Sequence, residues 1–280
     1  MQREYCAEVA RAEGEPMPGT ADVVDVWIML EYLPAWTAKA TSDNSLAAST
    51  RAWLTRLSDD VAARGLKPRV QLIRRPELDR PGVRLMVAAD DALHRIEASD
   101  YDALGERTLD DVLATTAVRD RQYFVCTNGQ RDVCCARFGL PTYAALRERV
   151  GDRVWQTTHV GGHRFAPNVL TLPRAALYGR VQPTEVDEFV DAIEHDRLAA
   201  KWLRGRTRHR PEVQAAEAAL AERGFDVSGS PMTRALDDGA QRITFGVHAA
   251  IVRPGAAREV LTSCGDERKA VVPWVVSEIA

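Results

Sequence analysis

The sequence predicts an α/β fold in which one order of elements occurs twice along the chain. In each half, a strand pattern is followed by a helical pattern, a further strand, a pair of strands and a closing helix. Strand patterns that alternate with helical patterns are typical of sheets with parallel strands. The chain has 280 residues, of which 45% are hydrophobic, so it can bury a substantial core.

The first half begins after residues 1–21, a polar stretch that predicts a loose leader with room for one short helix. Apolar residues at helical spacing then mark a helix that Gly65 ends. The elements expected in this half are a buried strand at 23–30, a helix over 46–61, strands at 70–73, 83–88 and 94–98, the last two as a hairpin, and a short helix at 109–113.

The second half repeats this order. Residues 139–141, Gly-Leu-Pro, are expected to bend or delay its first helix. Residues 183–185 open its last helix, which presents an apolar face. The expected elements are a strand at 123–125 that runs into Cys126, a helix over 136–150, a strand at 154–157, a hairpin of 169–172 with 177–181, and a helix from 183 with Val186, Phe189, Val190 and Ile193 on its apolar face.

The character of the chain changes at Lys201, where cationic side chains crowd together. We interpret this run as cations at a helix C-terminus and a solvated linker. The alternative is a docking patch for an acidic redox partner or a phosphate-bearing cofactor. A helix at 212–222 and strands at 243–247 and 271–276 then predict a small α+β extension. The run contains Lys201, Arg204, Arg206, Arg208, His209 and Arg210.

Composition excludes several functional classes. The net charge of −3 gives no indication of a nucleic-acid partner. The first residues lack the apolar core of a secretory signal, and no apolar run approaches the roughly 18 residues that a membrane span requires. Five cysteines, most of them clustered, do not form the pattern of a disulfide framework. We therefore expect a cytoplasmic protein with reduced thiols and no membrane partner.

The residues that carry chemistry gather in two short stretches. One runs from Cys126 to Cys135 with the sequence CTNGQRDVCC, and the other is HVGGH at residues 159–163. They hold three of the five cysteines and two of the six histidines. Thiolate and imidazole are the usual ligands of softer metals, so the pattern predicts a metal or iron–sulfur site. The two glycines in HVGGH favour a tight loop over a regular helix.

These motifs, together with Ala166-Pro167-Asn168, resemble the sucrase/ferredoxin-like family, a branch of the thioredoxin-like ferredoxins, over roughly residues 20 to 200. In that family, two cysteines and two histidines bind a [2Fe-2S] cluster. The resemblance therefore implies a ligand set of Cys126, Cys135, His159 and His163. The family spacing selects Cys135 over Cys134. Residues expected around the cluster are Arg131, Asp132, Cys134, Gly161, Gly162 and Arg164.

Asp132 has two expected uses, to accept an imidazole N–H or to cap the helix that follows it.

The order of elements in each half is that of the thioredoxin fold: strand, helix, strand, hairpin, helix. We therefore predict two tandem thioredoxin-like units. The expected domains are 1–118 without ligands, 119–205 with the cluster, and 206–280 as the extension.

The function implied by the resemblance is electron transfer through one [2Fe-2S] cluster, with a redox partner protein such as a reductase or an electron acceptor. A zinc-binding interaction module with Cys₂His₂ ligation is the alternative, because His-x₃-His fits zinc. Eight residues between the cysteines do not fit the usual zinc spacing.

Two further interpretations rank lower. Cleavage of sucrose, which the family name records, would need two carboxylates flanking the scissile bond, and no such pair is identifiable. We therefore expect a carrier rather than an enzyme with its own substrate. A thiol redox site at Cys134 and Cys135 is disfavoured because no Cys-x-x-Cys occurs. Cys6 and Cys264, far from both motifs in sequence, are predicted to be bystanders.

Overall fold

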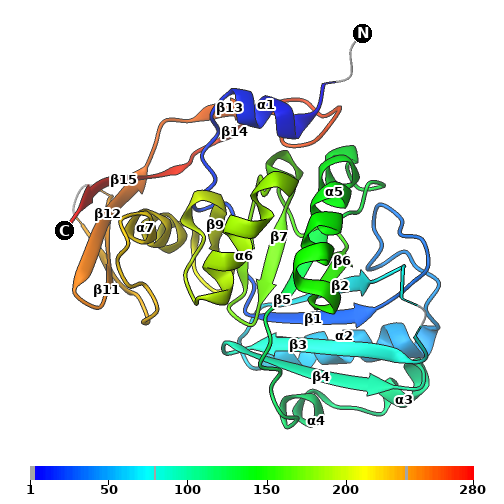
Figure 1. The fold of residues 1–280 in the computed structure, drawn as a ribbon. Coiled ribbons are helices and arrows are strands. Elements are labelled where there is room, and N and C mark those ends of the chain that lie inside the picture. The colour runs from blue at the N-terminus through cyan, green and yellow to red at the C-terminus, as the bar shows by residue number, and fades with distance from the viewer. Residues whose placement is uncertain (1–3, 79, 237–238) are drawn as a thin grey trace.

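A nine-stranded sheet forms the centre of the computed structural model, which describes residues 4–78, 80–236 and 239–280. Its strand order is β4-β3-β1-β2-β6-β5-β7-β8-β9. The sheet turns strongly along its length, so that β1 and β3 run nearly across the view of Figure 1 while β7 runs nearly upright. Such a turn follows from the right-handed twist of each strand.

The first half has the predicted order of elements. β1 pairs in parallel with β2 and antiparallel with β3, and β3 pairs antiparallel with β4, as the hairpin prediction required. Its elements are α1 (Cys6–Ala12), β1 (Val26–Glu31), α2 (Ala48–Ala63), β2 (Pro68–Arg74), β3 (Val83–Ala89), β4 (Ala92–Ala98), α3 (Tyr101–Gly105) and α4 (Leu109–Leu113).

The second half repeats the same pairings. β5 pairs in parallel with β6 and antiparallel with β7, and β7 pairs antiparallel with β8. Each half thus has the strand order and directions of a thioredoxin-like fold. The elements are β5 (Gln122–Cys126), α5 (Val133–Val150), η1 (Gly151–Arg153), β6 (Val154–Thr157), η2 (His163–Phe165), β7 (Val169–Leu172), β8 (Ala176–Tyr178), η3 (Pro183–Glu185), α6 (Val186–Glu194), η4 (Ala200–Trp202) and β9 (Leu203–Arg206).

The two halves share one sheet because β2 pairs antiparallel with β6. Only the ends of these strands meet, with Ile73 opposite Thr157 and Arg74 opposite Gln156. The predicted border between residues 205 and 206 falls inside β9, which pairs with β8. The division into domains at 118/119 and 205/206 stays a prediction.

Apolar side chains on the two faces of the sheet form separate cores. Trp53 of α2 packs with β1 to β3 in one core, and Phe189 of α6 packs with β5, β7 and β8 in another. Alternate residues of the same strands, among them Trp27 and Phe124, point to the opposite face. The third core on that face extends across both halves and contains Cys126 and Cys135.

The C-terminal part forms its own small α+β arrangement beside β9. α7 packs against β9 and against a four-stranded sheet in the order β10-β11-β12-β15. The hairpin of β13 and β14 lies next to α1, above α5 in Figure 1. The elements are α7 (Pro211–Glu222), β10 (Met232–Ala235), β11 (Gln241–Phe245), β12 (His248–Pro254), β13 (Arg258–Val260), β14 (Lys269–Val271) and β15 (Trp274–Ile279).

In the part of the chain that the structure describes, none of the helices combines the length and the apolar character needed to cross a bilayer. The cytoplasmic location stays a prediction.

Candidate metal centre

Cys126 and Cys135 reach the site from a strand end and a helix start. Cys126 is the last residue of β5, and its N–H donates to the carbonyl of Asn168 at 3.0 Å. Cys135 lies in the first turn of α5, after the N-cap residue Asp132. The Asp132 carboxylate accepts the N–H of Cys134 at 2.9 Å, so the helix-capping prediction for this residue is confirmed.

Helix α5 lies directly against the backbone of Cys126. A Cβ at Gly139 would collide with the carbonyl oxygen of Cys126, so only glycine allows this approach. The predicted delay of the helix is wrong, because α5 begins at Val133 and continues through Pro141. The helix therefore presents its first turn, with Cys135, to the end of β5.

The two histidines lie on the tight loop that the glycines predicted. Gly161 and Gly162 have φ angles of +92° and +66°, which L side chains rarely adopt. The loop ends in the short η2 turn that begins at His163. The imidazoles of His159 and His163 consequently stack, with ring centroids 4.5 Å apart.

The structure brings three of the four predicted ligands together and places the fourth beside them. Ligand atoms of Cys126, Cys135 and His159 all lie within 4.8 Å of one another. Cys135 Sγ is 3.9 Å from His159 Nδ1. His163 falls outside this group, but its Nδ1 is buried and has no hydrogen-bond partner among the described residues. A buried nitrogen without a partner is costly, so this atom is suited to a ligand role.

Burial and mutual contacts set the protonation of the site. The hydrogen bond from Cys135, with further support from His159, lowers the pKa of Cys126. The hydrogen bond with Cys126, together with burial, raises the pKa of Cys135 well above its ordinary value. Burial lowers the pKa of His163 to about 4. At neutral pH the site therefore holds a neutral imidazole at His163 and one favoured thiolate at Cys126.

The backbone of the histidine loop is held by side chains that the sequence motifs did not indicate. Arg69 and Gln71, both on β2 of the first half, donate to the carbonyl of His159 at 3.0 and 3.1 Å. Arg204 donates to the carbonyl of Gly161 at 2.9 Å. No local pattern around these residues marks them, because each acts across a large distance in sequence.

The remaining predicted neighbours have different surroundings. Arg131 is exposed. Arg164 forms an ion pair with Glu15 at 2.7 Å and lies over the ring of Phe165. Asp132 Oδ2 is 4.0 Å from His163 Nε2, which is too long for the expected hydrogen bond in this state.

The prediction that Cys6 and Cys264 are bystanders is wrong. Both lie against Cys134, whose sulfur is 3.7 Å from that of Cys6 and 3.3 Å from that of Cys264. Cys134 thus turns away from the Cys126–Cys135 pair and belongs to a separate cluster.

The cationic run from Lys201 is not a solvated linker, because its middle forms the buried strand β9. Arg204 and Arg206 are 1% and 3% exposed. Arg208 pairs with Asp91 at 2.6 Å, and Lys201 pairs with Glu185 at 3.0 Å. The run therefore offers few uncompensated charges for a docking partner.

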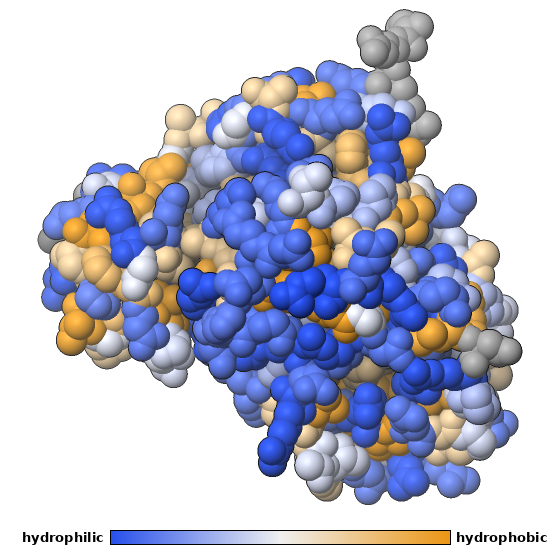
Figure 2. Space-filling model, in the orientation of Figure 1, coloured by the Kyte–Doolittle hydropathy of each residue, from blue (hydrophilic) through white to orange (hydrophobic). Residues whose placement is uncertain are grey.

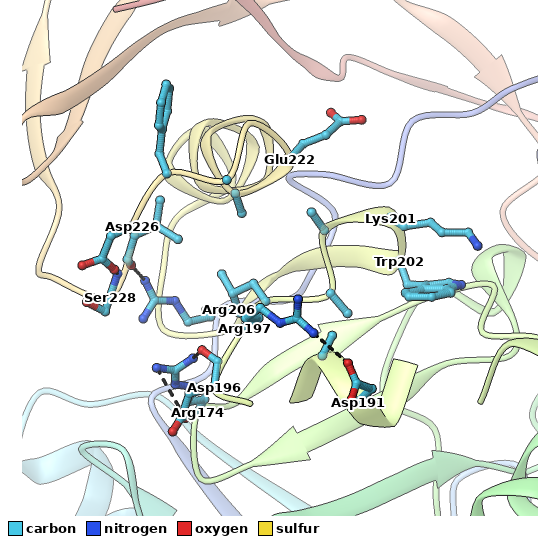
Figure 3. A pocket seen from close by; sticks show the side chains of 18 of the residues that line it. Arg174, Asp191, Asp196, Arg197, Lys201, Trp202, Arg206, Glu222, Asp226 and Ser228 are labelled. Atoms are coloured by element: carbon cyan, nitrogen blue, oxygen red, sulfur yellow. Dashed lines mark hydrogen bonds and ion pairs between the residues drawn. The ribbon is translucent and has the colours of Figure 1, made fainter. Parts of the chain in front are cut away.

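A separate pocket of about 560 Å³ is lined by residues of α6, η4, β9 and the end of α7. Its charges are paired across the lining, with Arg197 on Asp191 at 2.7 Å and Arg174 near Asp196 at 3.7 Å (Figure 3). Hydrophilic residues gather on the surrounding face in Figure 2. Among the described residues that line this pocket, none carries a thiol or an imidazole.

Alanine at Gly162 is expected to destabilise the protein more than alanine at a comparable exposed glycine. A Cβ at Gly162 would collide with the guanidinium of Arg204, and the positive φ adds about 1–2 kcal/mol of strain. Gly224 has a φ of +78° and nothing within 4 Å of its added Cβ, so G224A measures the strain alone. The thermal midpoint of G162A should lie several degrees below that of G224A, and equal midpoints would contradict the collision.

The part of the chain that contains this site is similar to known proteins. A model of the sucrase/ferredoxin-like family matches residues 17–205. The protein named altered inheritance of mitochondria protein 32, from Meyerozyma guilliermondii, is 36% identical over 89 residues, which are 26% of this chain and 30% of that protein. The chain thus matches less than a third of that relative.

Two solved structures are similar to this chain over about 30% of its length. The thioredoxin-like [2Fe-2S] ferredoxin from Aquifex aeolicus matches with 19% identity and a TM-score of 0.28, over 31% of this chain and 97% of that one. A cysteine-to-serine variant of the same ferredoxin matches with 21% identity and a TM-score of 0.27, over 30% and 97%. Since the family model spans more than half of the residues, the chain belongs to the sucrase/ferredoxin-like family.

Proposed function

We propose that this chain is an electron-transfer protein that carries one [2Fe-2S] cluster on Cys126, Cys135, His159 and His163. The observation that carries the proposal is the meeting of two buried thiols with the imidazole of His159, on which the ring of His163 stacks. The unpartnered Nδ1 of His163 fits a ligand in that position. When bound, such a cluster takes up and releases one electron at a time.

The residues present suit this role in charge. Two imidazoles in place of two thiolates leave two negative charges in the ligand set rather than four. Burial keeps His163 neutral, with a pKa of about 4. A less negative ligand set raises the reduction potential above the roughly −400 mV of plant-type ferredoxins.

The surroundings suit a carrier that meets its partner at one side. Cys126, Cys135 and His163 are buried, and Trp27 and Trp155 belong to the apolar core that contains the two cysteines. His159 is only partly buried. The imidazole of His159 is therefore the place where the site comes nearest to solvent. A redox partner protein, such as a reductase or an electron acceptor, would exchange electrons there.

The experiment that tests the proposal is metal and sulfide analysis of the full chain purified without oxygen, with absorption and EPR spectra. We expect red-brown protein with two irons and two sulfides per chain and a rhombic EPR signal after reduction. Colourless protein without iron and sulfide, from which the C126S substitution removes a bound zinc ion, would overturn the proposal in favour of a structural zinc module.

A further inference from the structure

Three cysteines that are remote in sequence meet at one point behind the first turn of α5. Cys6 begins α1, Cys134 lies in the first turn of α5, and Cys264 follows β13. Their sulfurs are 3.7 Å apart between Cys6 and Cys134, 3.3 Å between Cys134 and Cys264, and 3.6 Å between Cys264 and Cys6. All three are free thiols, and Cys6 and Cys134 are fully buried.

This triangle has the size of a single-ion site. In a tetrahedral zinc centre, two thiolates that are each about 2.3 Å from the ion lie about 3.8 Å from one another. The three observed separations are at or slightly below this value. Because all three sulfurs surround one point, they suit one ion rather than the two irons of a cluster.

A carboxylate completes the group. Both oxygens of Asp132 lie 3.8 Å from Cys6 Sγ. The same carboxylate accepts the N–H of Cys134 at 2.9 Å and that of Cys264 at 2.8 Å, so it positions two of the three cysteines. Its remaining contacts are the hydroxyl of Ser263 at 3.0 Å and His163 Nε2 at 4.0 Å.

We propose that Cys6, Cys134, Cys264 and Asp132 bind one Zn²⁺ ion, at a site separate from the cysteine–histidine centre. Zinc accepts thiolate sulfur together with carboxylate oxygen in four-coordinate sites. A harder oxygen ligand beside three thiolates disfavours copper(I), which prefers soft ligands only. With four protein ligands, the site has no open position and is structural rather than catalytic.

The ion would fasten α1 and the segment after β13 to the first turn of α5. Besides the cysteines, Leu261 belongs to a small buried apolar cluster with Ala7 of α1. The other contacts of the C-terminal hairpin with this part of the chain are polar and exposed. Arg258 donates to the carbonyl of Glu13 at 2.7 Å, and Arg268 pairs with its carboxylate at 2.6 Å. Exposed pairs of this kind contribute little to stability, because solvent screens the charges. A shared ion would add to this small apolar cluster and would join α1 and the 258–271 segment to α5 at one centre.

The test is a crossed metal analysis of the anaerobically purified full chain and two variants. Cys264 is only partly buried, so serine should disturb the fold less there than at Cys6 or Cys134. In C264S we expect zinc to fall from one ion per chain to none, while iron and sulfide stay unchanged. In C126S we expect the reverse, with zinc retained. Equal zinc in C264S and the unaltered chain would overturn the proposal, whether or not the cluster is present.

Two further measurements test the zinc site if C264S folds poorly. In D132N the asparagine oxygen still caps α5. If Asp132 only caps the helix, D132N should retain zinc as the unaltered chain does. If Asp132 is a zinc ligand, D132N should lose zinc to a chelator faster. In the unaltered chain, Co²⁺ should give thiolate-to-cobalt charge-transfer bands that C264S lacks. Intact mass under non-reducing conditions that shows a disulfide between two of the three cysteines would contradict the zinc site.

Discussion

Serine at Cys135 is expected to abolish retention of iron and sulfide, while serine at the adjacent Cys134 leaves both unchanged. Successive helix residues point about 100° apart, and here the two thiols face different clusters. Cys135 Sγ lies 3.9 Å from His159 Nδ1, whereas Cys134 Sγ lies 3.3 Å from Cys264 Sγ. The measurement is iron and sulfide per chain after anaerobic purification, compared with the visible absorption spectrum.

C126S is the positive control for this pair and should lose the cluster as completely as C135S. All three variants change one sulfur to oxygen in a buried position, so general effects of the substitution are matched. A chain that keeps its iron in C135S and loses it in C134S would show that the ligand is Cys134. That outcome would refute both the family spacing and the geometry of the helix start.

Methionine at Arg204 is expected to lower the free energy of unfolding by about 3–5 kcal/mol, which corresponds to a thermal midpoint about 10 °C lower. Arg204 is 1% exposed and donates to the carbonyls of Gly161 and Thr20 at 2.9 and 2.6 Å. It also donates to Asn168 Oδ1 at 2.9 Å. Methionine fills similar space but leaves these buried acceptors without a donor, at about 1–3 kcal/mol each.

Arg208→Met is the matched control, because it removes a cation from the same run. Arg208 forms a partly exposed ion pair with Asp91, so its loss should cost less than about 1 kcal/mol. Thermal unfolding followed by circular dichroism compares the two variants. Equal shifts would mean that the charge of the run as a whole, rather than the Arg204 contacts, stabilises the fold.

Burial lowers the pKa of Arg204 to about 9, so the side chain remains charged at neutral pH. Lysine at this position keeps a charge but lacks the planar fork that reaches three acceptors at once. We expect R204K to fall between the unaltered chain and R204M.

Most strands and helices of both halves, apart from α3 and β9, were predictable because their apolar patterns are local. Val26–Glu31 and Gln122–Cys126 are buried along their whole length, and such runs indicate central strands. The family spacing selected Cys135 as the ligand, and that choice stays a prediction. The start of α5 was predicted too late, because the carboxylate of Asp132 caps a helix that begins at Val133 and contains Pro141 in its interior.

What the sequence did not indicate depends on contacts between distant residues. Cys6 and Cys264 stand alone in their segments, so only the folded chain shows that they meet. Arg204 has the same sequence neighbourhood as a solvated basic run, yet β9 places it in the interior. Arg69 and Gln71 are ordinary polar residues of a strand until the histidine loop lies over them.

The short pairing between β2 and β6 has a consequence for synthesis. The ribosome synthesises Ile73 long before its partner Thr157. The edge of β2 therefore stays unpaired while the second half of the chain is translated. An unpaired strand edge is a template for pairing with other chains. When the protein is overproduced, many nascent chains expose β2 at the same time, and we expect aggregation. Nascent chains that are arrested before residue 154 lack β6 and should aggregate most.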